Sequence, residues 1–249
     1  MLRRNVCNFK KSVRAGTWFN RSNLPVSKIL TFTLLWLTLP HPRQSIIQRE
    51  LNISSRTVVD WSSFCREVCV HWAKNVSCKL GGPGKIVEID EAMFGKRKGN
   101  VGRPLIQQWI FGGVERGSTK SFFVPVDSRD QVTLIQHLHE WVLPGTTIIT
   151  DGWAAYKNIN REGYHHLTVN HSLNFVNPRT QAHIQTIERT WREVRQSIPK
   201  HGRRKYHYHG YLAEFQFQRA HPDAKSRLHY FLKSAAELYP GFNIQIPSA

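Results

Sequence analysis

The spacing of hydrophobic residues changes along the chain and separates predicted strands from predicted helices. Short β-branched and aromatic runs predict strands at 86–89, 108–114, 121–126 and 146–150. Apolar residues at helical spacing predict helices at 130–141, 184–194 and 223–238. A helix that links strands favours a mixed sheet with at least one crossover connection, so the fold class predicted for 85–221 is α/β.

The residues before this region show only helical spacing. An apolar run at 29–39 predicts a buried helix ended by Pro40 and Pro42, and it is shorter than the about 20 residues that a bilayer requires. Two short amphipathic helices follow, joined at Asn52-Ile53-Ser54, with Ser54 or Ser55 as the N-cap.

The second of these helices has two contrasting faces. Its predicted buried stripe consists of Val58, Trp61, Phe64 and Val68. Its exposed front is predicted to carry Ser55, Arg56 and Asp60. Two short helices around a tight turn are typical of a DNA-binding helix-turn-helix, and an ordinary helical hairpin is the alternative.

The charge of the chain indicates a polyanionic partner. Lysine and arginine number 35 against 17 acidic residues, so the formal net charge is +18. Nucleic acid is the first candidate partner, and a ribosomal or merely cationic protein is the alternative. The segment from Met1 to Arg49 holds no acidic residue and is either a solvated basic arm or one that contacts phosphates.

Acidic residues stand where the predicted strands end. The run Lys85-Ile-Val-Glu-Ile-Asp-Glu91 ends in two adjacent carboxylates, Asp90 and Glu91, and Asp151 follows the strand at 146–150. Aspartate is disfavoured in strands, so its place there requires a reason. Glu188 lies on a predicted helix, three residues after Gln185, and the two share a face. Carboxylates are ligands for magnesium, and two such ions can activate phosphodiester chemistry.

Several motifs together resemble the DDE transposases of the insertion-sequence and animal Merlin type. They occur in the family's order over about residues 12–221: Val87-Glu-Ile-Asp-Glu91, Gln108-Trp-Ile-Phe-Gly-Gly113, Thr150-Asp-Gly-Trp-Ala-Ala-Tyr156, His171 with Asn174-Phe-Val176, and His183-Ile-Gln-Thr-Ile-Glu188 with Trp191. The resemblance implies a ribonuclease-H-like mixed sheet flanked by helices.

The resemblance also implies which residues form the site. Asp90, Asp151 and Glu188 would be the catalytic triad and would bind two Mg²⁺ or Mn²⁺ ions. Glu91 matches a non-catalytic position, and Gln185 is the rival of Glu188 as third ligand. A carboxylate is the better ligand for a hard cation, which favours Glu188.

Basic residues supply the expected contacts to DNA phosphates. Arg195 matches the family's basic position after the triad. The other expected contacts are Lys96, Arg97, Lys98 and Arg103 in a glycine-rich loop, Ser55 and Arg56 on the helix-turn-helix, and Arg203 and Arg204 in a basic cluster. That cluster could also be a nuclear address.

The expected domains are a basic arm, remnant of a zinc ribbon, at 1–28, a helical helix-turn-helix region at 29–80, the ribonuclease-H-like domain at 85–221, and a C-terminal helix and tail at 222–249. Arg4 stands where the ribbon would have a partner for Cys7, so no zinc is expected in this chain. Cys65 and Cys69 are predicted to be small buried residues. The cysteine spacing supports no disulfide framework, so the protein is expected to be intracellular.

The function expected from these features is DNA transposition. The protein would bind terminal inverted repeats, cleave DNA strands and transfer them to target DNA, as a homo-oligomer, away from membranes and in the nucleus if eukaryotic. One alternative is a captured, catalytically inactive DNA-binding protein derived from a transposase. Another is a nuclease of the same fold that acts on RNA–DNA hybrids, for which a helix-turn-helix has no obvious use.

Overall fold

The computed structural model describes residues 12–75, 78–95, 107–169, 176–177, 182–199 and 204–241. Its N-terminal part is helical, with α1 (Val26–Thr38), α2 (Gln44–Leu51) and α3 (Ser55–Asn75). The side chain of Ser54 caps α3, because its Oγ accepts the amide hydrogen of Thr57 at 3.1 Å. Among the described residues, no helix is both long and apolar enough to cross a bilayer.

A mixed sheet forms the second part. Within the described residues it has five strands in the order β4-β3-β2-β6-β7. They are β2 (Ile86–Phe94), β3 (Gln108–Glu115), β4 (Ser121–Val126), β6 (Thr147–Thr150) and β7 (His165–Thr168). The pairs β2–β3 and β3–β4 are antiparallel, whereas β6 runs parallel to both β2 and β7. This is the ribonuclease-H-like arrangement that the resemblance implied.

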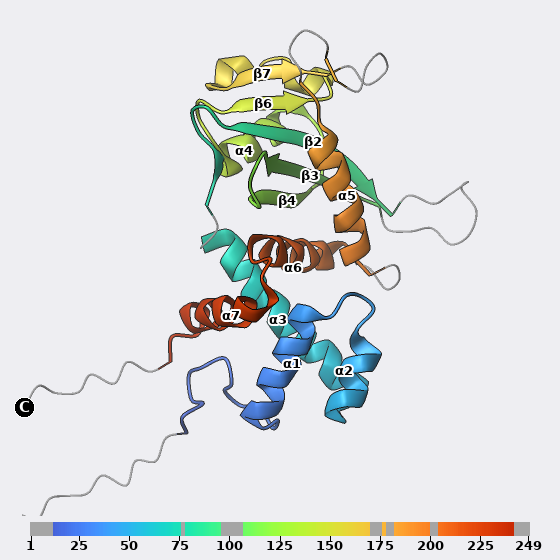
Figure 1. Cartoon of the computed structure of the whole chain (residues 1–249), viewed down its shortest axis with the longest axis vertical. Helices are drawn as coiled ribbons and strands as arrows, with labels where there is room; N and C mark the ends of the chain where they lie inside the picture. The colour runs from blue at the N-terminus through green and yellow to red at the C-terminus, as the bar shows by residue number, and fades with distance from the viewer. Residues whose placement is uncertain are drawn as a thin grey trace, which may run out of the picture.

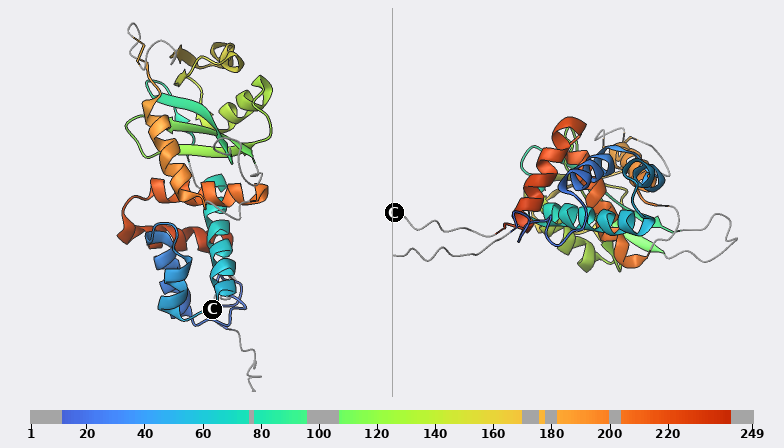
Figure 2. Two further views of the ribbon diagram at one scale, coloured as in Figure 1. Left: turned by 90° about the vertical axis from the view of Figure 1, so that its right-hand side faces the viewer. Right: turned by 90° about the horizontal axis from the view of Figure 1, so that it is seen from below.

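Helices cover both faces of the sheet. The helix α4 (Gln131–Trp141) packs on one face and α5 (Gln185–Ser197) on the other, as the turned view in Figure 2 shows. Asp130 caps α4 by accepting the amide hydrogen of Thr133 at 2.9 Å. The strand β2 therefore has two buried faces. Val87 and Ile89 belong to the core under α4, and Ala92 and Phe94 belong to the core under α5.

Smaller elements complete the sheet region. Two-residue strands β1 (Leu80–Gly81) and β5 (Val142–Leu143) pair in parallel beside the main sheet. Short 3₁₀ helices, η2 (Ala154–Tyr156) and η3 (Ile159–Glu162), lie between β6 and β7, and η4 (Lys205–His207) precedes α6.

The helices α6 (Tyr208–Ala220) and α7 (Ala224–Leu238) join the two parts of the molecule. Figure 1 shows α6 between the β4 edge of the sheet and α3, with α7 against the N-terminal helices. Phe231 of α7 lies in the same core as Trp18 and Trp61, so the C-terminal helix packs with the helices that begin the chain. The domain boundaries expected from sequence stay a prediction.

A buried ionic cluster fastens α6 to the helical part. Glu214 of α6 accepts hydrogen bonds from Arg43 and from Arg66 Nε at 3.1 Å, and its Oε1 lies 3.2 Å from His41 Nε2. Burial alone raises the pKa of Glu214, but Arg43, the His41 hydrogen bond and Arg66 together outweigh it and hold the pKa at about 2. No local sequence pattern pointed to this cluster, because its members come from separate elements.

The predicted helices and strands recur in the structure with shifts in their ends. The strand expected to end near Asp90 continues to Phe94, so Asp90 lies within β2 and not at its end, because the pairing with β3 extends to Gln108. One side chain was placed wrongly: Phe64 is 45% exposed instead of lying in the buried stripe of α3. The stripe follows Val58, Trp61, Cys65, Val68, Cys69 and Trp72. Phe64 lies beside this stripe, with its ring edge-on to Trp61 at 5.5 Å between centroids. A helical period alone does not fix the width of the buried face.

Candidate active site

Asp90 lies in the middle of the sheet, on β2, and faces α5. Successive residues of a strand point to opposite faces, so Glu88, Asp90 and Ala92 share one face, and Ile89 and Glu91 share the other. The carboxylate of Asp90 accepts a hydrogen bond at Oδ2 from the indole Nε1 of Trp191 on α5, at 2.9 Å. Asp90 is half-buried.

The parallel pairing of β2 and β6 brings Asp151 level with Asp90. Glu88 is paired with Ile149, and continuing this register by two residues sets Asp151 beside Asp90. Ile149 packs on the α5 side, so Asp151, two residues further, is directed to that side as well. Asp151 is exposed, and its Oδ1 accepts the amide hydrogen of Trp153 at 3.0 Å.

The first turns of α5 carry the two candidates for the third ligand. Gln185, the first residue of the helix, is exposed, whereas Glu188 is half-buried. Ile187 and Trp191 pack into the core beneath α5, and this contact holds the intervening turn against the sheet. The negative charge of Glu188 acts on Asp90, which places it within electrostatic range of the strand-borne aspartate.

Glu88 fixes the beginning of α5 to β2. This carboxylate has no exposed surface. Its Oε2 accepts the amide hydrogen of Ile187 at 2.9 Å, and its Oε1 accepts from Arg116 Nε at 2.7 Å. Arg116 also donates to the carbonyl oxygen of His183 at 2.5 Å, so β2, β3 and the entry to α5 are held by one network. Glu188 follows directly after the anchored Ile187.

A glycine in β3 makes room for the indole that reaches Asp90. Gly112 is paired with Asp90 across the sheet. A Cβ at this position would lie 2.8 Å from the Trp191 ring and 2.6 Å from the Phe123 ring, closer than such atoms approach in proteins. The glycine therefore lets the indole of Trp191 lie close enough to β3 to donate to the aspartate.

Burial and neighbouring charges raise the pKa of Asp90 and of Glu91. Burial is the largest cause that raises the pKa of Asp90, to about 7, against the hydrogen bond from Trp191, and the charges of Asp151 and Glu188 raise it further. Glu91 points to the other face. Burial, followed by the charges of Asp90 and Asp151, raises its pKa to about 8, and Arg129 lowers it.

The donor set of this edge fits a hard divalent cation. Asp90, Asp151 and Glu188 offer oxygen ligands, and a cation would offset the mutual repulsion that raises the pKa of Asp90. Within the part of the chain that the structure describes, no three His, Cys, Asp or Glu side chains are close enough to hold a metal ion. Asp90 and Asp151 are instead held by hydrogen bonds from Trp191 and from Trp153.

The other predicted contacts are spread over the molecule. Arg195 is exposed on α5, with its guanidinium 5.2 Å from the centroid of Phe94 at the end of β2. Ser55 and Arg56 are exposed at the start of α3, and Arg204 is exposed before α6. Lys96, Arg97, Lys98, Arg103 and Arg203 lie outside the described residues, as do Arg4 and Cys7 of the expected zinc-ribbon remnant.

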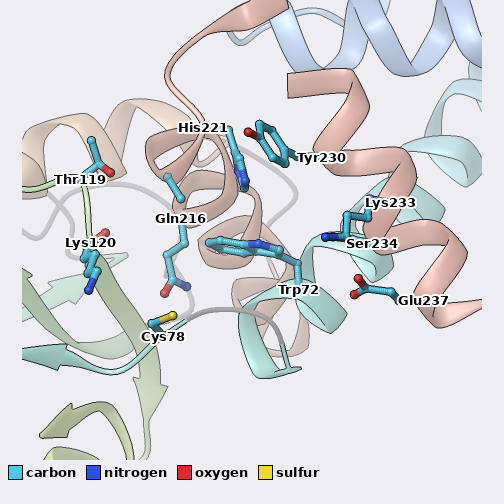
Figure 3. Close-up of a pocket in the computed structure, with 12 residues that line it drawn as sticks. Trp72, Cys78, Thr119, Lys120, Gln216, His221, Tyr230, Lys233, Ser234 and Glu237 are labelled. Atoms are coloured by element: carbon cyan, nitrogen blue, oxygen red, sulfur yellow. The ribbon is translucent and has the colours of Figure 1, made fainter. Parts of the chain in front are cut away.

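Two cavities of the described region lie away from these acids. One of about 420 Å³ is shown in Figure 3, where Trp72, His221 and Tyr230 face Lys120 and Lys233 between the helices and the β3–β4 turn. A second, of about 510 Å³, lies between α3, β4 and α6. Neither is lined by Asp90, Asp151 or Glu188, which lie at the open edge of the sheet.

Glu88 and Arg129 are two residues of the site that were not expected from the sequence. The alternation of the strand was a usable signal for Glu88, because it puts Glu88 and Asp90 on one face of β2. No comparable signal pointed to Arg129, whose guanidinium carbon lies 3.6 Å from the ring centroid of Trp109 and 4.6 Å from that of Trp153. Arg129, Trp109 and Trp153 come from separate parts of the chain, and only folding brings them together.

Comparison with known proteins identifies the family of the chain. Residues 79–220 match the family described as ISXO2-like transposase domain, which is more than half of the chain. The chain belongs to this family. No curated protein matches it significantly.

A solved structure of the simian T-cell lymphotropic virus intasome in complex with PP2A regulatory subunit B56 gamma is similar at 14% identity. The match covers 83% of this chain and 74% of that chain, with a TM-score of 0.32.

Proposed function

We propose that this protein is a DDE-type transposase of the insertion-sequence and Merlin type that cleaves DNA strands at transposon ends and transfers them to target DNA. The observation that carries the proposal is the register of β2 and β6, which sets Asp151 level with Asp90 beneath α5. The membership of residues 79–220 in a transposase family supports the same reaction class.

Asp90, Asp151 and Glu188 are the residues proposed to hold two Mg²⁺ or Mn²⁺ ions. When bound, such ions activate the attacking water or hydroxyl and stabilise the leaving oxygen of a phosphodiester. The protein's own groups orient the ligands: Trp191 holds one oxygen of Asp90, and the Trp153 amide holds one oxygen of Asp151. Glu88 fixes the turn of α5 that carries Glu188.

The net positive charge of the chain and its proposed helix-turn-helix are the other parts of the proposed DNA interaction. A formal charge of +18 attracts the DNA backbone irrespective of sequence. The exposed Ser55 and Arg56 begin the second helix of a helix–turn–helix and would contact the transposon ends. Joining two ends to one target requires two active sites, so a homo-oligomer on DNA is part of the proposal. In a eukaryote, this substrate would place the protein in the nucleus.

Strand cleavage tests the proposal directly. The substrate is a supercoiled plasmid that carries the DNA flanking the coding region, incubated with Mg²⁺ or Mn²⁺. Asp90→Asn, Asp151→Asn and Glu188→Gln should each slow nicking by roughly a thousandfold, because removal of a ligand disables the metal chemistry. The control is Glu193→Gln on the same helix, an exposed acid that pairs with Arg219.

Two further variants separate the rival ligands. Glu91→Gln should retain nicking, because Glu91 faces away from α5. Gln185→Ala should retain it as well if Glu188 is the third ligand. Nicking that survives in Asp90→Asn, Asp151→Asn and Glu188→Gln would refute the assignment. A wild type that binds DNA without cleaving it under any condition would favour the captured, inactive alternative.

A further inference from the structure

Arg129 belongs to the loop that follows β4, and the sheet topology brings this loop to the acidic edge. The strand β4 runs in the same direction as β2, because both are antiparallel to β3. The carboxyl ends of β2, β4 and β6 therefore lie along one edge. Asp90 and Asp151 stand on or just after two of these strands, and Arg129 follows the third.

The guanidinium of Arg129 is held in place by aromatic rings. Its central carbon lies 3.6 Å from the ring centroid of Trp109 and 4.6 Å from that of Trp153, both within cation–π range. Trp153 comes two residues after Asp151 and donates its amide hydrogen to that aspartate. The positive charge of Arg129 also acts on Glu91, the neighbour of Asp90. Trp109 and Trp153 pack against the core under α4, and Glu91 faces that side of β2, so Arg129 approaches the acidic edge from the face opposite to α5.

Within the described ranges, the hydrogen-bond donors of this guanidinium have no protein acceptor. Among the described residues, no oxygen accepts a hydrogen bond from Arg129 and no carboxylate forms an ion pair with it. The indole rings contact the flat group through its face, whereas its N–H donors point outward in its plane. Arg129 is half-buried, so its donors are not wholly enclosed by protein. A planar set of free donors matches two oxygens of a phosphodiester.

We propose that Arg129 binds a backbone phosphate of DNA beside the acidic edge and so positions the strand for cleavage. This inference rests on the proposed function for the identity of its ligand. The indoles of Trp109 and Trp153 orient the guanidinium before DNA arrives, which reduces the entropy lost on binding. The competing interpretation is that Arg129 serves only to pack the two indoles together.

The test measures binding of a fluorescein-labelled DNA duplex of arbitrary sequence by anisotropy, in EDTA, over a range of salt concentrations. Each phosphate contact contributes about 0.9 to the slope of log affinity against log salt. Arg129→Gln should lower this slope by about 0.9 and weaken binding at low salt roughly ten- to hundredfold. Arg129→Lys should keep most of the slope but lose affinity, because it retains the charge and lacks the planar donors.

The matched control is Arg161→Gln, which removes one exposed positive charge from η3, between β6 and β7. It should leave the slope of the wild type unchanged. Near-ultraviolet circular dichroism and the unfolding midpoint report whether the indoles have been disturbed. A changed spectrum with an unchanged slope in Arg129→Gln would overturn the proposal and leave Arg129 a packing residue.

Failure of this inference is distinct from failure of the proposed function. If the slope falls in Arg129→Gln while the wild type nicks no plasmid, the phosphate site stands and the catalytic proposal fails. If the wild type nicks plasmid and Arg129→Gln retains both the slope and the nicking rate, the phosphate site fails alone.

Discussion

Trp191 donates its indole hydrogen to Oδ2 of Asp90 across 2.9 Å, from a ring that lies over Gly112 of the neighbouring strand. The helix α5, the central strand β2 and its neighbour β3 thus meet at the carboxylate of Asp90. The hydrogen bond lowers the pKa of Asp90, in opposition to the larger effect of burial. The hydrogen bonding and the pKa of Asp90 therefore depend on how α5 and β3 pack around β2.

Replacing Trp191 by phenylalanine should cost roughly 1–3 kcal/mol beyond the loss of ring size, because a half-buried acceptor loses its donor. The control is Trp18→Phe, a buried tryptophan whose indole nitrogen has no hydrogen-bond partner among the described residues. Urea unfolding of both variants gives the comparison. Equal destabilisation would mean that the hydrogen bond to Asp90 contributes nothing measurable.

Alanine at Gly112 should destabilise the fold by roughly 1–3 kcal/mol, because its Cβ overlaps Trp191 and Phe123. Alanine at Gly113 should cost a similar amount, but its Cβ meets Phe122 and Ile89 on the other face. Only Gly112→Ala should alter the fluorescence of Trp191, measured as the difference from the same variant in a Trp191→Phe background. An identical response of the two alanine variants would contradict this division of the faces.

Glu88→Gln should destabilise the protein by roughly 3–5 kcal/mol, because it breaks a buried ion pair with Arg116. It should also speed hydrogen exchange at the Ile187 amide, which donates to this carboxylate in the wild type. Exchange followed by mass spectrometry on the peptide that spans the start of α5 measures the effect. In the control Glu193→Gln, a half-exposed pair should change stability by about 0.5 kcal/mol or less.

Acid should unfold the protein in part through Glu214. Its folded pKa of about 2 lies below its ordinary value of 4.5, so the ionised carboxylate contributes stability that is fully present above about pH 4.5. That contribution is lost as the pH falls toward 2. Glu214→Gln should cost roughly 3–5 kcal/mol at neutral pH and flatten the dependence of stability on pH in this window. Denaturant titrations at several pH values measure both, and an unchanged acid slope would exclude Glu214 as a cause.

Magnesium or manganese should raise the unfolding midpoint of the wild type, because an ion bound only by the folded state stabilises it in proportion to the logarithm of ligand excess. Asp90→Asn should lose this shift, and Glu91→Gln should keep it. Differential scanning fluorimetry over a metal titration, with EDTA to reverse it, gives the readout. A shift of the same size in Asp90→Asn would place the bound ion elsewhere.

Much of this protein is predictable from its sequence because the signals are local. Strand runs, the cap at Ser54 and the acid that follows β6 all depend on neighbouring residues. The order of the motifs, which matches a family, also groups Asp90, Asp151 and Glu188. Their joint role as metal ligands stays a prediction, supported by the register that sets Asp151 beside Asp90 and by the charges of Asp151 and Glu188, which raise the pKa of Asp90.

Other relationships depend on contacts between distant elements, which periodicity does not contain. The amide of Ile187 donates to Glu88, and the ring of Trp191 lies close to Gly112. Both contacts depend on the position along β2 and β3 at which α5 packs. The exposure of Phe64 likewise depends on how wide a face of α3 is covered, which the helical period does not give.

The linear order of residues defines most of the strands and helices, because these depend on neighbours along the chain, but it did not reveal β7 (His165–Thr168) or α6 (Tyr208–Ala220). The buried carboxylate that anchors α5 and the arginine that lies beside the acids emerge only in the folded protein. Contacts of that kind are set by strand register and helix placement, which join residues far apart in the chain.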